Sequence, residues 1–212
     1  ESIMTRKYDI QLVSEIRNKE FNTIDANGIT IINKPVPDDA RKNILDPRVL
    51  EIAKKKKEVH KNIVFSSKYS LRAQRVRPDK VNYDLTQIQV VTEEIVIPIQ
   101  NDHYIAIFVN YTNSSKKDRP ALIFIHGGGF TAGDYSIYAN AMKFIAEQSE
   151  AVVIFPGYRL APENPFPSGI DDSWTTIEWV YQNAEDFGID KNKIMVAGDS
   201  AGGNIAAACE IK

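Results

Sequence analysis

Three short, uninterrupted hydrophobic runs stand out in the second half of the chain. They are Ala121–Ile125, Ala151–Phe155 and Ile194–Ala197. A run that is apolar on both faces suits a parallel strand buried between two layers of helices. Between the runs, the spacing of apolar residues predicts helices at about Ile137–Gln148 and Asp172–Phe187. The alternation of strand and helix predicts an α/β fold with a doubly wound, mostly parallel sheet.

A different pattern precedes these runs. Apolar and polar residues alternate in Leu85–Val91, Glu94–Ile99 and Tyr104–Tyr111. Alternation of this kind predicts antiparallel strands that have one buried and one solvated face. Asn101-Asp102 suits a tight turn between the last two strands. We therefore expect antiparallel strands at the start of the sheet and parallel strands after them.

Residues 1–80 are polar and charge-rich, and we expect them to form a helical segment distinct from the core at 81–212. Amphipathic helices are predicted at Ile10–Glu20 and from Val49 to about His60. Asp46-Pro47 would supply the cap and the first turn of the second helix. Neither helix carries a chemical motif.

Composition excludes several classes of partner. The 212 residues have a net charge of -2 and a charged fraction of 25%, so no global bias favours nucleic acid or an anionic membrane. The Lys54–Lys57 run is expected to be a solvated helix face, with anion binding as the less favoured alternative. The sequence has no window that resembles a membrane span or a signal peptide.

The single cysteine excludes an intrachain disulfide framework and fits a reducing compartment. We expect Cys209 to pack as a small apolar group. Together with the lack of a signal sequence, this favours a cytoplasmic protein. The chain starts at Glu1 rather than methionine, which leaves a removed leader open.

The segment Gly198–Gly203, Gly-Asp-Ser-Ala-Gly-Gly, joins the last hydrophobic run to a helix of small residues at Ala201–Cys209. A Gly-x-Ser-x-Gly match alone is a weak signal. Its position between a strand and a helix is the setting of a nucleophile elbow, in which a serine sits on a sharp turn. Ser200 is thus a candidate nucleophile, and the alternative is an ordinary helix N-cap.

The neighbours of this serine suit the same interpretation. Gly198 and Gly202 would leave room where a Cβ atom would collide. The backbone N–H of Ala201, at the helix start, could stabilise a developing negative charge. Asp199 is too close to Ser200 in the chain to serve as the acid of a triad, so we expect a structural or orienting role.

A glycine-rich loop, His126-Gly127-Gly128-Gly129, follows the first hydrophobic run. Consecutive glycines allow backbone N–H groups to converge on one point, as in an oxyanion hole. A flexible turn or a phosphate loop are the alternatives, but the spacings of phosphate and dinucleotide motifs are missing. His126 belongs to this loop and is not expected to be the general base. His103, beside the predicted turn, is expected on the surface.

Three motifs now stand in order along the chain: His126–Phe130 (HGGGF), Tyr158–Pro167 (YRLAPENPFP) and Gly198–Asn204 (GDSAGGN). In this order and spacing they resemble the hormone-sensitive-lipase-like carboxylesterases of the α/β-hydrolase fold. The resemblance runs from about Val90 to the end of the chain.

This resemblance implies a carboxylic ester hydrolase that acts on short or medium acyl esters without a metal or an organic cofactor. It implies Ser200 as nucleophile and the N–H groups of Gly127, Gly128 and Ala201 as the oxyanion hole. The residues with implied supporting roles are His126, Gly129, Asp199, Gly198, Gly202, Arg159 and Glu163. The helical segment at 1–80 would be a cap that shapes the pocket, and homodimers are common among such enzymes.

The chain departs from the family pattern after the serine. In α/β-hydrolases the catalytic acid and histidine follow the nucleophile, but residues 201–212 contain no histidine. Both groups are expected beyond residue 212 or on a second polypeptide, together with a parallel strand beside Ile194–Ala197. Alone, the 212 residues are expected to be nearly inactive. The alternative is a non-catalytic small-molecule-binding protein or a pseudoenzyme on the same scaffold.

Overall fold

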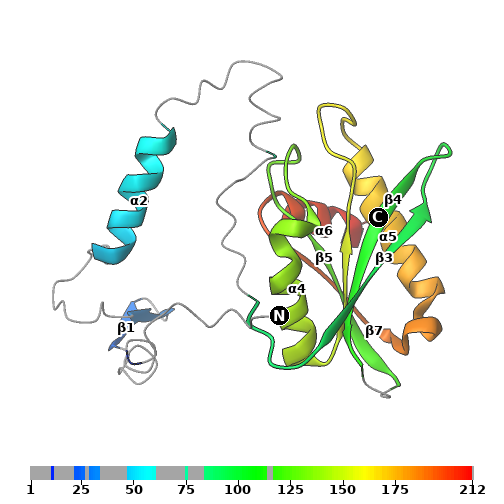
Figure 1. Ribbon diagram of the computed structural model, residues 1–212, viewed down its shortest axis with the longest axis horizontal. Helices are drawn as coiled ribbons and strands as arrows, with labels where there is room; N and C mark the ends of the chain where they lie inside the picture. The colour runs from blue at the N-terminus through cyan, green and yellow to red at the C-terminus, as the bar shows by residue number, and fades with distance from the viewer. Residues whose placement is uncertain are drawn as a thin grey trace. The chain divides into compact units, whose positions relative to one another are not determined.

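The computed structural model describes a defined part of the chain (Figure 1). The described residues are Gln11, 22–26, 29–33, 47–60, Arg75, 84–113 and 117–211. They fall into two compact units, Glu1–Ser66 and Ser67–Lys212. This division lies before residue 80, where the sequence predicts a boundary, and the role of the first segment as a cap stays a prediction.

The first unit contains a hairpin and a helix. Strand β1 (Asn22–Ala26) pairs antiparallel with β2 (Ile29–Asn33). Helix α2 (Pro47–His60) confirms the predicted second helix. The hairpin was not predicted, although Asn27-Gly28 between two β-branched runs is a strong hairpin signal. Asp46 and, apart from Gln11, the predicted helix Ile10–Glu20 lie outside the described residues.

The second unit is built on a mixed sheet of five strands in the order β3-β4-β6-β5-β7. The β3–β4 and β4–β6 pairs are antiparallel, whereas β5 pairs parallel with both β6 and β7. This arrangement confirms an α/β fold whose first strands are antiparallel. The strands are β3 (Val90–Pro98), β4 (Tyr104–Thr112), β5 (Arg119–Ile125), β6 (Val152–Pro156) and β7 (Ile189–Gly198).

The predicted strand at Leu85–Val91 is wrong, because β3 is one strand that starts at Val90. The backbone N–H groups of Gln87 and Ile88 donate to the side chain of Glu147. A backbone N–H that is held by a carboxylate is not free to join a strand ladder. The predicted turn at Asn101-Asp102 is confirmed, and both residues have positive φ, 58° and 57°.

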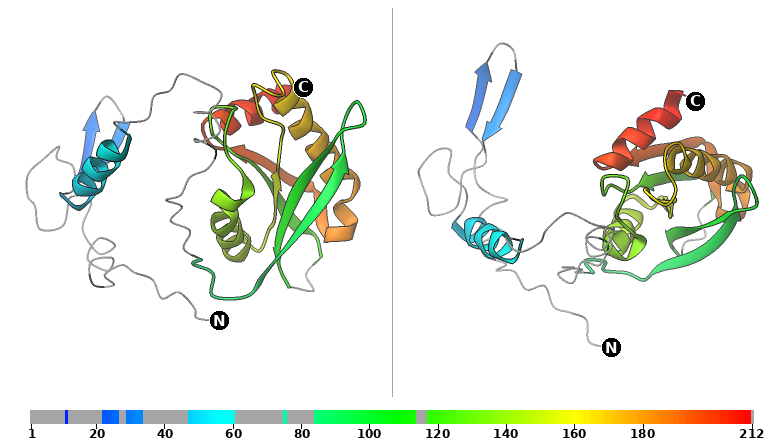
Figure 2. Two further views of the ribbon diagram at one scale, coloured as in Figure 1. Left: turned by 45° about the horizontal axis from the view of Figure 1, so that its top comes forward. Right: turned by 90° about the horizontal axis from the view of Figure 1, so that it is seen from above.

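Helices cover both faces of the sheet, as Figure 2 shows. Helix α4 (Tyr135–Ser149) packs on one face against Val153 and Phe155 of β6. Helices α5 (Ser168–Gln182) and α6 (Ala201–Ile211) cover the other face, with the short 3-10 helix η1 (Ala184–Phe187) after α5.

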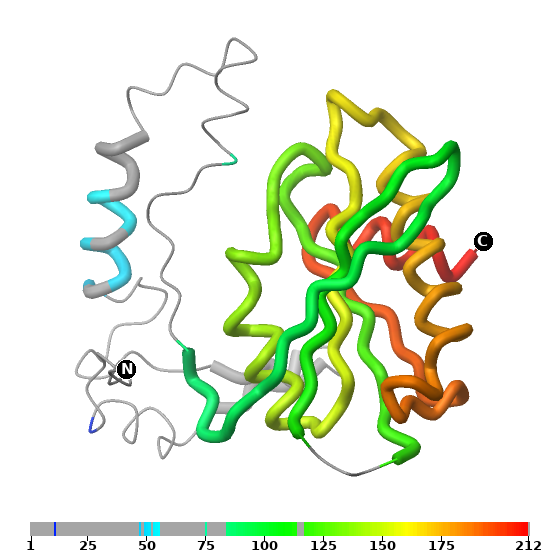
Figure 3. Tube along the Cα trace, turned by 45° about the vertical axis from the view of Figure 1, so that its right-hand side comes forward, coloured from blue at the N-terminus to red at the C-terminus, as the bar shows by residue number. Residues whose placement is uncertain are grey.

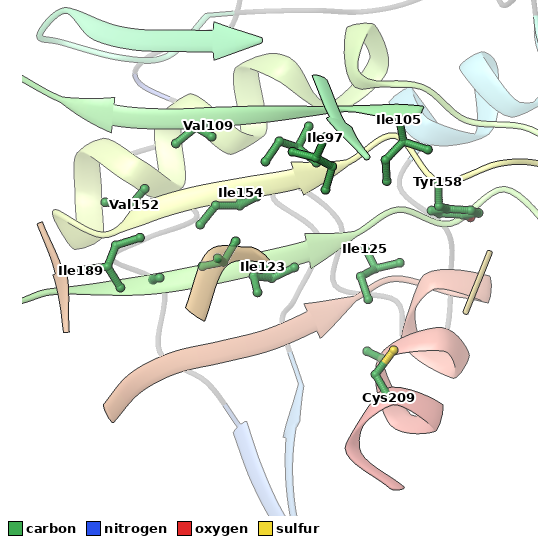
Figure 4. Close-up of a cluster of buried hydrophobic side chains, with 14 of the residues drawn as sticks. Ile97, Ile105, Val109, Ile123, Ile125, Val152, Ile154, Tyr158, Ile189 and Cys209 are labelled. Carbon is green, nitrogen blue, oxygen red and sulfur yellow. The ribbon is translucent and has the colours of Figure 1, made fainter. Parts of the chain in front are cut away.

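The larger apolar cluster lies on the α5–α6 face, where isoleucine and valine side chains of successive strands meet (Figure 4). Because side chains alternate along a strand, Ile123 and Ile125 of β5 point to this face, while Leu122 and Phe124 face α4. Cys209 of α6 is buried in the cluster, as the sequence predicts.

Strand β7 differs from the interior strands in its exposure. All five residues of β6 are buried, whereas Met195 of β7 is 52% exposed. Within the described part of the chain, β7 pairs only with β5 and forms an edge of the sheet. The apolar composition of this edge agrees with the expected neighbouring strand, which stays a prediction.

Candidate active site

The sheet brings the three sequence motifs to one edge of the second unit. Strands β6, β5 and β7 run parallel, so the loops that follow them emerge at the same edge (Figure 3). These loops are residues His126–Ala132 after β5, the Pro-rich loop (Gly157–Pro167) after β6, and Asp199-Ser200 after β7. We call His126–Ala132 the oxyanion loop after the role that the sequence predicts for it. In α/β folds, ligands bind at the carboxyl ends of the strands.

Ser200 occupies the sharp turn between β7 and α6. It is exposed and has a φ of 51°, a strained conformation for a residue with a Cβ atom. The glycines explain how the turn approaches β5. A Cβ atom on Gly202 would lie 2.0 Å from the carbonyl oxygen of Ile125, and one on Gly198 would lie 2.5 Å from the carbonyl carbon of Gly202. This geometry is that of a nucleophile elbow.

The N-cap alternative for Ser200 finds no support in the hydrogen bonds. The carbonyl oxygen of Asp199 accepts from the N–H groups of Gly202, at 2.8 Å, and Gly203, at 3.3 Å. No hydrogen bond of the Ser200 hydroxyl is formed with any described residue. Backbone therefore satisfies the N–H groups of Gly202 and Gly203, and the hydroxyl is left for other contacts. The N–H of Ala201 likewise has no acceptor among the described residues.

The oxyanion loop contains three consecutive residues with positive φ. The angles are 126° for Gly128, 64° for Gly129 and 64° for Phe130. The loop turns so tightly that a Cβ atom on Gly128 would lie 1.9 Å from the carbonyl oxygen of Ala132. Among the described residues, neither Gly128 nor Gly129 has an acceptor for its N–H.

Asp199 links the oxyanion loop to the elbow. Its Oδ1 accepts from the N–H of Gly127 at 2.7 Å, and its Oδ2 accepts from the hydroxyl of Tyr138 at 3.1 Å. These contacts suit the orienting role expected for Asp199. They also engage the N–H of Gly127 that the resemblance assigned to the oxyanion hole. A donor held by a carboxylate is not free for an oxyanion in this arrangement, so the place of Gly127 in an oxyanion hole stays a prediction.

His126 lies in the core of the second unit. It is 1% exposed, and its ring stacks on Tyr158 at a centroid distance of 4.3 Å. Nδ1 donates a hydrogen bond to the carbonyl oxygen of Gly127 at 2.7 Å. Burial lowers the pKa of His126. His103 is exposed in the turn between β3 and β4, as the sequence predicts.

The Pro-rich loop is anchored by an ion pair. The Arg159 guanidinium binds the carboxylate of Asp172 through three contacts between 2.8 and 3.2 Å, and the Arg159 backbone N–H donates to the same group. Asp172 is 1% exposed. Hydrogen bonding to Asp172 raises the pKa of Arg159. The pair gives Arg159 the scaffold role that the sequence predicts.

Two residues near the site were missed from the sequence. Tyr138 of α4 binds Asp199. Arg75 donates to backbone carbonyl groups of the oxyanion loop and of the Pro-rich loop, and to the carboxylate of Glu163. Neither residue lies in a motif, and each contact spans more than fifty residues. No local pattern of residue types could have identified them.

A hollow of about 390 Å³ has a wall that includes Phe108, His126, Asp134 and Tyr158. Ser200 is not part of this wall, so the hollow does not define where a substrate would meet the serine.

In the described ranges, no group of three or more histidine, cysteine or carboxylate side chains could hold a metal ion. No described helix has the length and apolarity needed to cross a bilayer.

A family model, a curated relative and solved structures all indicate similarity to α/β-hydrolases and esterases. The model of a family described as alpha/beta hydrolase fold matches residues 122–212. Carboxylesterase NlhH from Mycobacterium tuberculosis is 47% identical over 88 residues, which are 42% of this chain and 28% of NlhH.

Solved structures of esterases are also similar. EstE1, a thermostable carboxylesterase cloned from a metagenomic library, has a TM-score of 0.62 at 33% identity, over 69% of this chain and 49% of EstE1. A hyperthermophilic esterase from Pyrobaculum calidifontis has a TM-score of 0.61 at 32% identity, over 79% of this chain and 52% of that esterase. The chain therefore spans about half the length of these esterases and less of NlhH.

Proposed function

From the premise that this chain has the α/β-hydrolase fold and is related to carboxylesterases, we propose that its protein hydrolyses carboxylic esters with Ser200 as the nucleophile. The observation that carries the proposal is the elbow. An exposed serine with a φ of 51° stands at the start of α6, at the sheet edge that also bears the donors of the oxyanion loop. A hydroxyl and convergent N–H groups are the parts that acyl transfer requires.

In the proposed reaction, the Ser200 hydroxyl oxygen attacks the ester carbonyl carbon and gives up its proton to a general base. The carbonyl oxygen becomes an oxyanion, which accepts hydrogen bonds from the N–H groups of Gly128, Gly129 and Ala201. The bond to the alcohol oxygen then breaks, and the base returns the proton to that oxygen. Water attacks the resulting acyl-serine in the same way and releases the acid.

We assign the general base and its acid partner to sequence beyond residue 212. Of the three histidines in the chain, His126 is packed among aromatic rings, His103 lies in a turn between β3 and β4, and His60 ends α2 in the first unit. In α/β-hydrolases the acid and the histidine follow the serine along the chain. The edge strand β7 offers a place for the strands that would carry them. Short or medium acyl esters are the proposed substrates.

The test is hydrolysis of p-nitrophenyl acetate and butyrate by the full-length protein, with labelling by a fluorophosphonate probe. Ser200→Ala should abolish labelling and lower kcat by roughly a millionfold. Ser149→Ala, at the far end of α4, is the matched control and should leave both unchanged. The proposal fails if the wild-type protein is inert to both esters and to the probe, or if Ser200→Ala retains activity. Tight binding of an ester without turnover would favour the non-catalytic alternative.

A further inference from the structure

The oxyanion loop holds a conformation that its own sequence only partly supports. Gly128 and Gly129 adopt positive φ readily, but Phe130 has a φ of 64° and carries a bulky side chain that is 46% exposed. Strain of this kind persists only where surrounding contacts over-determine it. The loop must therefore be held from outside, and the holding contacts influence where the Gly128 and Gly129 donors point.

Arg75 supplies contacts of this kind. Its Nε donates to the carbonyl oxygen of Thr131 at 2.6 Å, and its Nη2 donates to the carbonyl oxygen of Ala161 at 2.9 Å. Ala161 in turn donates its N–H to the carbonyl oxygen of Phe130 at 2.9 Å. One guanidinium thus joins the oxyanion loop directly after its strained residue to the Pro-rich loop that packs on it.

Glu163 fixes the guanidinium in this position. Nη1 donates to Oε1 at 3.1 Å and Nη2 donates to Oε2 at 2.7 Å, which forms a bidentate pair. The Arg75 side chain is 29% exposed and that of Glu163 is 60% exposed. An ion pair this exposed contributes little stability by itself. Its effect is geometric, because the planar fork of arginine satisfies the carboxylate and two carbonyl groups at once.

We infer that Arg75 is a positioning residue, which clamps the oxyanion loop to the Pro-rich loop and so aims the N–H groups of Gly128 and Gly129 at the developing oxyanion. This inference rests on the proposed function, and it deepens it by extending the site to a residue outside all three motifs. Arg75 acts through backbone carbonyl groups and does not touch the substrate. Loss of the clamp should therefore slow the chemical step more than it weakens substrate binding.

The experiment uses the full-length protein with Arg75→Ala and Arg75→Lys. Misplacement of catalytic donors by about 1 Å can lower rates by about a hundredfold, so Arg75→Ala should lower kcat by about 10- to 100-fold, with KM within about threefold of the wild type. Arg75→Lys keeps the charge but not the fork and should lose nearly as much. Glu163→Gln, which keeps an acceptor for the fork, should lose about threefold or less.

Hydrogen exchange of the backbone amides of Thr131 and Ala132, which both donate to the carbonyl oxygen of Gly128, provides a readout that does not depend on catalysis. Exchange should become faster in Arg75→Ala and Arg75→Lys. The matched control is Lys193→Ala, which removes an exposed cation paired with Asp190 and should change neither kcat nor exchange in the loop. If Arg75→Ala is poorly folded, Arg75→Lys carries the test.

The two proposals fail in different ways. If the wild type hydrolyses esters, Ser200→Ala is inactive, and both Arg75 variants keep kcat within about twofold and wild-type exchange, the inference about Arg75 is overturned and the proposed function stands. If the wild type is inert, the proposed function fails. Exchange at Thr131 and Ala132 then still decides whether Arg75 holds the loop.

Discussion

The nucleophile elbow and the oxyanion loop reach strained backbone conformations by different means. The elbow at Ser200 is held by close approach of backbone to backbone, through Gly198 and Gly202 against Ile125. The oxyanion loop is held by side chains from other parts of the chain, chiefly Arg75 and Asp199. The first arrangement depends on glycines inside the motif, and the second depends on residues outside its own motif.

Because of this difference, we expect substitutions in the two regions to affect different properties of the protein. A change in the elbow forces backbone atoms into the same space, so it should appear first in stability. A change in the contacts of the oxyanion loop leaves the packing of the sheet intact and moves only donors, so it should appear first in rate.

The strongest test of the elbow is Gly202→Ala. The added Cβ atom would lie 2.0 Å from the carbonyl oxygen of Ile125, and backbone cannot move aside as a flexible side chain can. We expect a loss of more than about 3 kcal/mol in the free energy of unfolding, at the upper end of overpacking effects. Urea denaturation of the full-length protein measures it.

The neighbouring glycine provides the control. A Cβ atom on Gly203 would lie 3.2 Å from the carbonyl oxygen of Gly198, and alanine favours the helix there. Gly203→Ala should therefore change the free energy of unfolding by less than about 1 kcal/mol. Equal effects of the two substitutions would show that the close approach to β5 does not hold the elbow.

Two substitutions of Asp199 weaken the contact between the oxyanion loop and the elbow to different degrees. Asp199→Ala removes the acceptor of both the Gly127 N–H and the Tyr138 hydroxyl, and we expect kcat to fall by about 10- to 100-fold. Asp199→Asn keeps one carbonyl oxygen for Gly127 and should lose less. Steady-state kinetics with p-nitrophenyl butyrate measures both.

Tyr138→Phe is the matched control for these variants, because it removes only the contact from α4. We expect a decrease in kcat of less than about fivefold, as for one neutral hydrogen bond. A larger effect for Tyr138→Phe than for Asp199→Ala would mean that α4, and not the elbow, orients the oxyanion loop.

The smallest expected effect is a pH dependence of stability from His126. Burial lowers the pKa of His126 below its ordinary value of 6.5, so the unfolded chain takes up a proton at a higher pH than the folded chain. The free energy of unfolding should decrease as the pH falls from 6.5 toward the lowered pKa. Thermal unfolding between about pH 7 and pH 5.5 measures this slope.

This slope would show that His126, although it lies in the oxyanion loop, affects the free energy of unfolding. It would then be an exception to the expectation that changes in this loop appear first in rate. His126→Phe, which keeps an aromatic ring in the stack, should reduce the slope. An unchanged slope in His126→Phe would show that other groups produce the pH dependence.

The parallel strands, the turn at Asn101-Asp102 and the helix at Pro47–His60 could be predicted, because each follows from residues that are close in sequence. The start of β3 was misplaced, because Glu147 of a later helix captures the N–H groups of Gln87 and Ile88. Alternation along a strand carries no information about such a distant acceptor.

The chemistry of the site follows the same division. The residue types and spacings of the motifs are sufficient to name Ser200, the glycine-rich loop and the α/β-hydrolase resemblance, because a strand, a tight turn and a helix are local structures. Only the tertiary structure decided which loop N–H groups are free: Gly127 is bound to Asp199, while Gly128 and Gly129 have no acceptor among the described residues. Hydrogen-bond partners are set by the meeting of distant segments, as with Arg75, and no local pattern encodes that meeting.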